Sequence, residues 1–407
     1  MILKRKILFA ALIAAVATIP LKNQWNSIAT ILFVLTCFCQ HPLSVSITKI
    51  KESKLWVIPL VYFVWLAFSH FWDVSGGYRL RDIERYLILF FAPPAMAVAP
   101  EEMKTFIKKA CFVFIGVTIA VCLVSLVKSY NEYQATHDYR VFYYQYLAEQ
   151  TGLNAIFLSN YCLASISWLL YYGFLGKRHS KRIYALICAC IAFLFVVIFL
   201  LSSKLLIFLT LVVMVIFILI LGYTKGFLMR AVLITSVVLA VGLVAVDKLS
   251  YLKWRIESTE LKMYTGQEDN QNGIAIRLYM WKAVSGLIKE RPLLGYGIRG
   301  GRLETLAKYH KDGFEMGVLG DYHAHNQYLE SWLMAGIPGL ILLVSLMAIV
   351  LTRALQSKNF LLLLIVIHFM TQCVFESTFE VQHELVFYIF FIFLFYYHGP
   401  RIRNALL

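Results

Sequence analysis

Two histidines lie where a polar stretch of this sequence runs into a long apolar segment. His323 and His325 belong to the stretch 322–328, and the apolar segment follows without a break. The beginning of a helix presents unpaired backbone N–H groups and the positive end of the helix dipole, and both attract anions. An imidazole beside an anion site suits general base catalysis. A polar residue at a wet membrane boundary is the alternative interpretation of His325.

The spacing that follows His325 is helical. If a helix begins at about residue 325, steps of three and four place five residues on one face: His325, Tyr328, Trp332, Gly336 and Gly339. The two glycines would allow a neighbouring helix to approach closely, and the proline between them predicts a kink.

Apolar runs of membrane-spanning length recur along almost the whole chain of 407 residues. Hydrophobic residues make up 60% of it and charged residues 15%, a composition typical of polytopic helical membrane proteins. The predicted fold is all-α, with one long helical outer loop. Twelve transmembrane helices are expected, at about residues 7–21, 27–45, 55–73, 86–99, 110–127, 153–175, 183–201, 205–223, 227–246, 326–352, 359–376 and 385–398.

The formal net charge of +15 reflects membrane topology more than ligand binding, and no nucleic-acid partner is expected. With the N-terminus in the cytoplasm, 19 of the 38 Lys and Arg residues fall on the cytoplasmic side and seven on the short outer loops. This asymmetry follows the positive-inside rule, so both termini are predicted to be cytoplasmic.

The remaining 12 basic residues lie in one long outer loop, at about residues 247–325. Residues 252–264 and 274–290 of this loop are expected to form amphipathic helices. The chain is therefore divided into membrane helices one to nine at 1–246, a periplasmic loop or cap at 247–325, and membrane helices ten to twelve at 326–407.

The sequence predicts no metal site and no cofactor. All eight cysteines lie in or at the edge of apolar runs, which favours buried small side chains over disulfides or metal ligands. The first outer loop, at residues 21–26, has no carboxylate, and the chain contains no Asp-x-Asp. Positively charged side chains would then have to stabilise any phosphate leaving group.

Three motifs in the last third of the chain resemble the O-antigen ligase and polymerase superfamily, of the Wzy_C type. The first is the histidine motif, with Asn326 directly after His325, Gly336 after nine more residues and Gly339 after another two. The other two lie in the long loop, in the same order as in the family: Arg277-x-x-x-Trp281, and Pro292-x-x-Gly295-x-Gly297. The resemblance implies a GT-C-like fold in a bacterial inner membrane, with the active site facing the periplasm.

The resemblance also implies roles for single residues. Arg277 would help to hold the pyrophosphate of a polyprenyl-linked glycan, and a guanidinium does match phosphate oxygens in a bidentate fork. An arginine snorkelling from an interfacial helix is the alternative. His325 would accept the proton of the acceptor hydroxyl or orient that hydroxyl. The family's second arginine lies in a short outer turn, which reads Ser202-Ser203-Lys204 here. Lysine supplies the charge of that arginine but not its fork.

Further substrate contacts are expected near these residues. Arg81 and Arg85 lie four apart in another outer loop, where they are candidates for phosphate contacts, although the adjacent Asp82 and Glu84 could neutralise them. Glu330 lies one turn inside the membrane, where an ionisable group is a functional candidate unless it is protonated or paired with a neighbouring helix. Asn326 and Tyr328 complete the predicted substrate-binding set. For the polar residues of other spans, Asn160, His368, Gln372 and Glu376, interhelical hydrogen bonding is expected.

The family resemblance implies a metal-independent, inverting glycosyltransferase of the ligase type. It would transfer a preassembled glycan from undecaprenyl pyrophosphate to lipid A-core during lipopolysaccharide biosynthesis, with membrane lipids around it. An O-antigen polymerase and a protein O-oligosaccharyltransferase share the histidine motif and stay open as alternatives. A transporter or flippase would place charges along the middle of the bundle, whereas the candidates here gather at its outer face.

Overall fold

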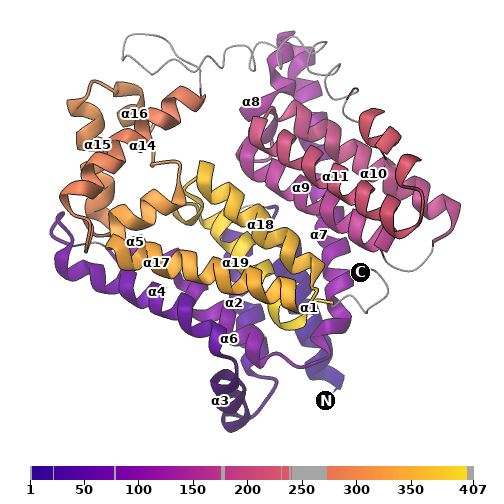
Figure 1. The fold of residues 1–407 in the computed structure, drawn as a ribbon, viewed down its shortest axis with the longest axis horizontal. Helices are drawn as coiled ribbons and strands as arrows, with labels where there is room; N and C mark the ends of the chain where they lie inside the picture. The colour runs from indigo at the N-terminus through magenta and orange to yellow at the C-terminus, as the bar shows by residue number, and fades with distance from the viewer. Residues whose placement is uncertain are drawn as a thin grey trace. The chain divides into compact units, whose positions relative to one another are not determined.

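This computed structural model describes residues 2–21, 23–77, 79–175, 179–230, 232–237, 240 and 273–400. Over these residues the secondary structure is helical and contains no strand. The predicted all-α class is therefore confirmed. The chain divides into two compact units, and Figure 1 colours them by position along the sequence.

The first unit draws its described residues from 1–33 and 102–257. Its helix α9 packs against α7, α10 and α11, while α1 packs along α7. Buried Ser159, Ser165 and Ser167 line α9 and allow the neighbouring helices to approach closely. The elements are α1 (Ile2–Thr18), α7 (Met103–Thr136), η3 (Tyr139–Phe142), α8 (Tyr144–Glu149), α9 (Ala155–Leu170), η4 (Tyr171–Leu175), α10 (Lys181–Leu200) and α11 (Lys204–Thr224).

The second unit draws its described residues from 34–101 and 273–400. Helix α17 packs against α18 and α4, and α19 packs against α18 and α6. Every residue of α19 from Leu385 to Phe395 is buried. The elements are α3 (Leu43–Glu52), η1 (Lys54–Trp56), α4 (Val57–Phe68), η2 (Ser69–Trp72), α5 (Leu80–Glu84), α6 (Leu87–Val98), α14 (Gly273–Glu290), α15 (Ile298–Lys311), α16 (Glu315–Leu319), α17 (Gln327–Gln356), α18 (Phe360–Phe375), η5 (Thr378–Glu380) and α19 (Gln382–His398). Helix α2 (Asn23–Phe38) has residues in both units.

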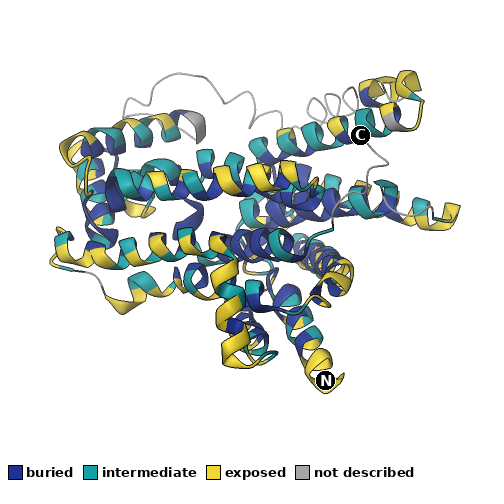
Figure 2. Cartoon of the chain, turned by 60° about the horizontal axis from the view of Figure 1, so that its bottom comes forward, coloured by how far each residue is buried: buried dark blue, intermediate teal, exposed yellow. Residues whose placement is uncertain are grey.

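Six of the described helices are long and apolar enough to span a membrane. Large apolar side chains on them are exposed, among them Leu186, Val196 and Phe208, which is the pattern of lipid-facing helices. Figure 2 shows exposed and buried residues side by side along the helices. The protein is thus a multi-pass membrane protein. The predicted total of twelve spans stays a prediction, because α1, α6, α18 and α19 are shorter and part of the segment 227–246 lies outside the described residues.

One predicted span is not a single straight helix. The segment 27–45 was expected to be continuous, but α2 ends at Phe38, α3 begins at Leu43, and the two are bent by 102°. Pro42 precedes α3 with an extended backbone, at φ −57° and ψ 152°. Because proline disfavours the helical conformation in the residue before it, the sequence Gln40-His41-Pro42 ends the first helix.

The described part of the long loop contains three helices rather than one. Helix α14 confirms the predicted amphipathic helix 274–290, whereas α15 and α16 were not predicted. The predicted helix 252–264 lies outside the described residues. In Figure 1 the three loop helices form a group beside α17, and both α14 and α15 pack against it.

Candidate active site

His325 precedes helix α17 instead of beginning it. Its backbone is left-handed, at φ 46°, and α17 starts at Gln327. Asn326 is the N-cap, and its side-chain oxygen accepts a hydrogen bond from the Leu329 backbone N–H at 3.0 Å. The prediction that His325 shares one helical face with Tyr328 and Trp332 is therefore wrong. The cap residue turns the chain, so His325 projects from the loop and not from the helix.

The His325 ring is paired with a carboxylate from another part of the chain. Nδ1 of His325 lies 2.7 Å from Oε2 of Glu376, directly after the C-terminal end of α18. The second oxygen of the same carboxylate, Oε1, accepts a hydrogen bond from Nη2 of Arg277 at 2.6 Å. One carboxylate thus joins the two residues that the sequence predicted to be catalytic.

Helix α14 holds Arg277 and Trp281 on one face, four residues apart. Nε of Arg277 donates to the Phe375 carbonyl at 3.1 Å. The indole N–H of Trp281 donates to the carbonyl of His325 at 3.3 Å, and its ring packs against Phe375. The Arg-x-x-x-Trp motif therefore fixes α14 to both ends of the His325–Glu376 pair.

The site is partly open to solvent. The side chains of His325 and Arg277 are 30% and 26% exposed, and that of Glu376 is 13% exposed. Burial by itself raises the pKa of Glu376, but the adjacent His325 and Arg277 outweigh that effect and lower the pKa to about 2. Glu376 is therefore ionised at neutral pH and accepts hydrogen bonds without donating any.

The segment that follows α18, residues 376–380, contacts four residues of the predicted site, although the sequence suggested only interhelical hydrogen bonding for Glu376. Ser377 donates to Oε2 of Glu330 at 3.1 Å, and the Phe379 backbone N–H donates to Oε1 of Gln327 at 2.6 Å. Glu380 pairs with Arg85 at 3.2 Å and accepts a hydrogen bond from Tyr86.

Arg85 and Arg81 differ in their surroundings. Nη1 of Arg85 also donates to the Glu380 carbonyl at 2.7 Å, so its carboxylate partner is remote in sequence and not the adjacent Asp82 or Glu84. Arg81 is exposed on α5. The segment 376–380 thus contacts Arg85 as well as Arg277 and His325. Lys204 begins α11 in the other unit.

The remaining predicted contacts, Glu330 and Tyr328, bind within the protein. Glu330 is 2% exposed, and its Oε2 accepts a hydrogen bond from the Ala324 backbone N–H at 2.9 Å. Its other oxygen lies 3.7 Å from Nδ1 of His323. Tyr328 donates to the Met370 carbonyl at 3.1 Å. These partners lie in the loop before α17, and the further partner Ser377 follows α18.

Gly336 of the histidine motif makes room for a turn and not for a helix. Gly336 has φ 66° and ψ −171°, which interrupts α17, and a Cβ there would collide with the Leu293 carbonyl. A Cβ on Gly295 would in turn meet the Leu333 carbonyl. The close partner of α17 is therefore the Pro292–Gly297 turn, and the expected approach of a neighbouring helix at Gly336 is wrong.

This turn satisfies the backbone groups that the break in α17 sets free. The N–H groups of Tyr296 and Gly297 donate to the carbonyls of Leu333 and Met334 at 2.8 and 3.0 Å. The Ile337 N–H donates to the Pro292 carbonyl at 3.0 Å. Without such partners, broken helical backbone at membrane depth would be strongly unfavourable.

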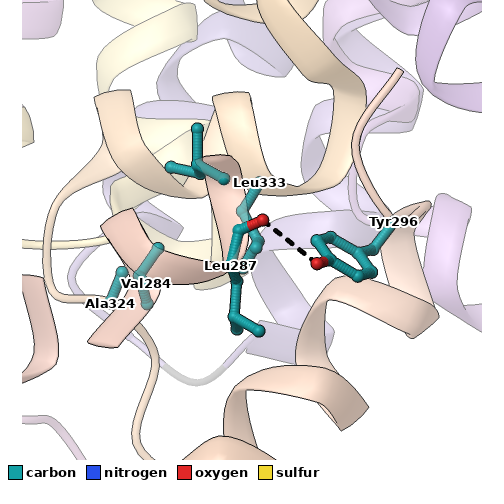
Figure 3. Packing of buried hydrophobic residues seen from close by; sticks show 6 residues of the cluster. Val284, Leu287, Tyr296, Ala324 and Leu333 are labelled. Atoms are coloured by element: carbon teal, nitrogen blue, oxygen red, sulfur yellow. Dashed lines mark hydrogen bonds between the residues drawn. The ribbon is translucent and has the colours of Figure 1, made fainter. Parts of the chain in front are cut away.

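A small apolar core locks the same turn to α14 and α17. Val284 and Leu287 of α14 pack with Tyr296, Ala324 and Leu333, as Figure 3 shows. The Tyr296 hydroxyl donates to the Leu287 carbonyl at 3.0 Å. Because Ala324 adjoins His325, this core places the α14 arginine and the histidine in a fixed register.

Asp73, which the sequence did not single out, directly follows η2 and fastens α15 to it. Its carboxylate accepts hydrogen bonds from the backbone N–H groups of Arg299 and Gly300, at 3.0 and 3.1 Å. A Cβ on Gly297 would collide with this carboxylate, and one on Gly300 would collide with the Val74 side chain. Asp73 is a short polar residue just after an apolar run, which is the only local signal for an N-capping role.

A family model described as O-antigen ligase, Wzy_C, matches residues 186–344. That span includes Arg277, the turn at Pro292–Gly297 and the whole histidine motif, and it ends before Glu376. No curated protein matches the chain. The chain thus contains a Wzy_C-type domain at residues 186–344, which supports its membership of the O-antigen ligase and polymerase superfamily.

Proposed function

We propose that this protein is an O-antigen ligase. It transfers a preassembled glycan from undecaprenyl pyrophosphate to lipid A-core, at the periplasmic face of the bacterial inner membrane. The observation that carries the proposal is the shared carboxylate of Glu376, which holds His325 at 2.7 Å and Arg277 at 2.6 Å. A base for the acceptor hydroxyl thus lies beside a cation for the pyrophosphate.

In the proposed step, the acceptor hydroxyl gives its proton to Nε2 of His325 while its oxygen bonds to the anomeric carbon of the donor. The bond between that carbon and the phosphate oxygen breaks, and undecaprenyl pyrophosphate leaves with the electron pair. Direct displacement of this kind inverts the anomeric centre. Undecaprenyl pyrophosphate and the glycosylated acceptor are the products.

Cationic side chains stabilise the negative charge of the leaving group, and the reaction needs no metal. Arg277 contacts the pyrophosphate directly, because its bonds to Glu376 and Phe375 already orient the guanidinium. Arg85 and Arg81 supply further positive charge to the donor. Asn326, Tyr328 and Glu330 shape the beginning of α17 around the acceptor.

The lipopolysaccharide of a strain lacking this protein tests the proposal. A ligase predicts core without attached glycan, together with an accumulated pool of long undecaprenyl-linked chains. Single-repeat caps on the core would indicate an O-antigen polymerase, and an unchanged lipopolysaccharide would indicate protein glycosylation or transport.

Purified protein with undecaprenyl-pyrophosphate glycan and lipid A-core then tests the residues. We expect His325→Ala and Arg277→Ala each to lower transfer by about 10²-fold or more. His310→Ala is the matched control, since His310 also pairs with a glutamate but is 74% exposed on α15. Transfer at the normal rate by His325→Ala, or loss of transfer on chelation of divalent cations, would contradict the mechanism.

A further inference from the structure

We propose that Glu376 is a positioning residue for His325: it fixes the ring with its proton on Nδ1 and its lone pair on Nε2. This inference deepens the proposed function and rests on it for the catalytic consequence. The geometry behind it is the 2.7 Å contact between Nδ1 and Oε2. The sequence motifs and the matched family domain at residues 186–344 both leave Glu376 out.

The tautomer follows from what the two partners are able to donate. An ionised carboxylate only accepts hydrogen bonds, so the nitrogen that faces it must carry a proton. In a neutral imidazole the other nitrogen, Nε2, then has the free lone pair that a general base needs. Within the described part of the chain, the structure shows no hydrogen bond that occupies Nε2 of His325.

Hydrogen bonds fix the Glu376 carboxylate itself, so it holds the His325 ring in one orientation. Oε1 of Glu376 is bound by Arg277 at 2.6 Å, which prevents the carboxylate from turning away from His325. Glu330 also restrains His325 and Glu376 indirectly. Its Oε2 accepts hydrogen bonds from the Ala324 backbone N–H at 2.9 Å and from the Ser377 hydroxyl at 3.1 Å. These are the neighbours of His325 and of Glu376 in the chain.

Two further contacts restrain His325, one at its backbone and one at its ring. The left-handed backbone of His325, at φ 46°, is held by the bond from Trp281 to its carbonyl. Tyr322 packs perpendicular to the imidazole, at 89° and 5.8 Å between ring centroids. A sparsely populated backbone conformation persists only where the surroundings impose it, and such residues concentrate at active sites.

Proton transfer changes the net charge of the cluster formed by Arg277, Glu376 and His325. Before the step, Arg277 and Glu376 carry opposite charges and His325 is neutral, so the cluster is neutral. Once His325 has taken the acceptor proton, the cluster carries one positive charge while the pyrophosphate gains negative charge. Glu376 faces the new imidazolium, and the remaining positive charge of Arg277 serves the leaving group.

The ring itself gives the first test, because nitrogen-15 NMR of histidine distinguishes the two neutral tautomers. Protein labelled at histidine is measured in lipid nanodiscs at a pH where the ring is neutral, and the His325 signals are assigned from a His325→Gln sample. We expect the Nδ1–H form in the wild-type protein. In Glu376→Gln the side-chain amide is able to donate to Nδ1, which selects the Nε2–H form.

Transfer kinetics give the second test. Glu376→Gln is expected to lower kcat by about 10²-fold or more, since the wrong tautomer removes the base. The affinity for undecaprenyl pyrophosphate should change less than in Arg277→Gln. Glu376→Asp, which keeps the charge but shortens the reach, should recover part of kcat. Glu315→Gln is the matched control, because Glu315 also bonds to Nδ1 of a histidine, at 2.9 Å, and is exposed.

The two tests separate this inference from the proposed function. The Nε2–H form in wild-type protein, or normal kcat in Glu376→Gln, would overturn the positioning role. The predicted tautomer in a protein that transfers no glycan to lipid A-core but lengthens lipid-linked chains would support the role of Glu376 and overturn the ligase assignment. If Glu376→Gln does not fold, the wild-type tautomer and Glu376→Asp still decide.

Discussion

Replacing Gly336 with alanine should displace the Pro292–Gly297 turn from the break in α17. At φ 66° and ψ −171° the backbone of Gly336 lies in a region that is nearly closed to residues with a Cβ, and holding alanine there costs roughly 1–3 kcal/mol. The new methyl group would also push away the carbonyl of Leu293.

Displacement of the turn would break three backbone hydrogen bonds. These are the bonds of Tyr296, Gly297 and Ile337, at 2.8, 3.0 and 3.0 Å. Each contributes about 0.5–1.5 kcal/mol, and some are kept if the turn moves only partly. Strain and lost bonds together predict a destabilisation of roughly 3–6 kcal/mol. Transfer should fall as well, because the turn sets the register of Arg277 and His325.

Thermal unfolding in detergent or nanodiscs, followed by tryptophan fluorescence, measures the effect. We expect Gly336→Ala to lower Tm by at least about 5 °C. Gly286→Ala is the control, since Gly286 lies inside α14 with open space where its Cβ would be, and alanine there should stabilise by up to about 1 kcal/mol. Equal Tm values for Gly336→Ala and wild-type protein would refute the account of the break.

Two further predictions concern the carboxylates outside the histidine motif. Asp73→Ala should destabilise the protein by about 1–2 kcal/mol, because two backbone N–H groups of α15 lose their acceptor. The same unfolding assay measures this loss, with Asp73→Asn as the control because it keeps an acceptor oxygen. For Glu376, His325 and Arg277 outweigh burial and lower the pKa from 4.5 to about 2. A lowered folded-state pKa stabilises the protein fully above pH 4.5, and this contribution fades as pH falls toward 2. The Tm difference between wild type and Glu376→Gln should therefore shrink as pH falls from 4.5 toward 2; a difference that grows over this range would contradict the assigned pairing.

Local patterns were sufficient to predict most of the helices. Apolar runs gave a helix at each predicted span that the structure describes, and the steps of Arg277 and Trp281 along the chain predicted α14. Local patterns did not predict where a helix is interrupted. Pro42 bends one predicted span, and Gly336 interrupts α17 by taking a conformation that only a specific partner, the Pro292–Gly297 turn, selects.

The sequence by itself determined the helical membrane class and the residues His325 and Arg277, since hydrophobic periodicity and motif spacing are read along a single stretch of chain. Only the tertiary structure decided that both meet at Glu376, which lies 51 residues from His325 and 99 from Arg277. In the sequence Glu376 looks like any polar residue at the end of an apolar helix. Its role depends on the packing of α14, α17 and α18, because contacts between distant segments are set by that packing and not by local pattern.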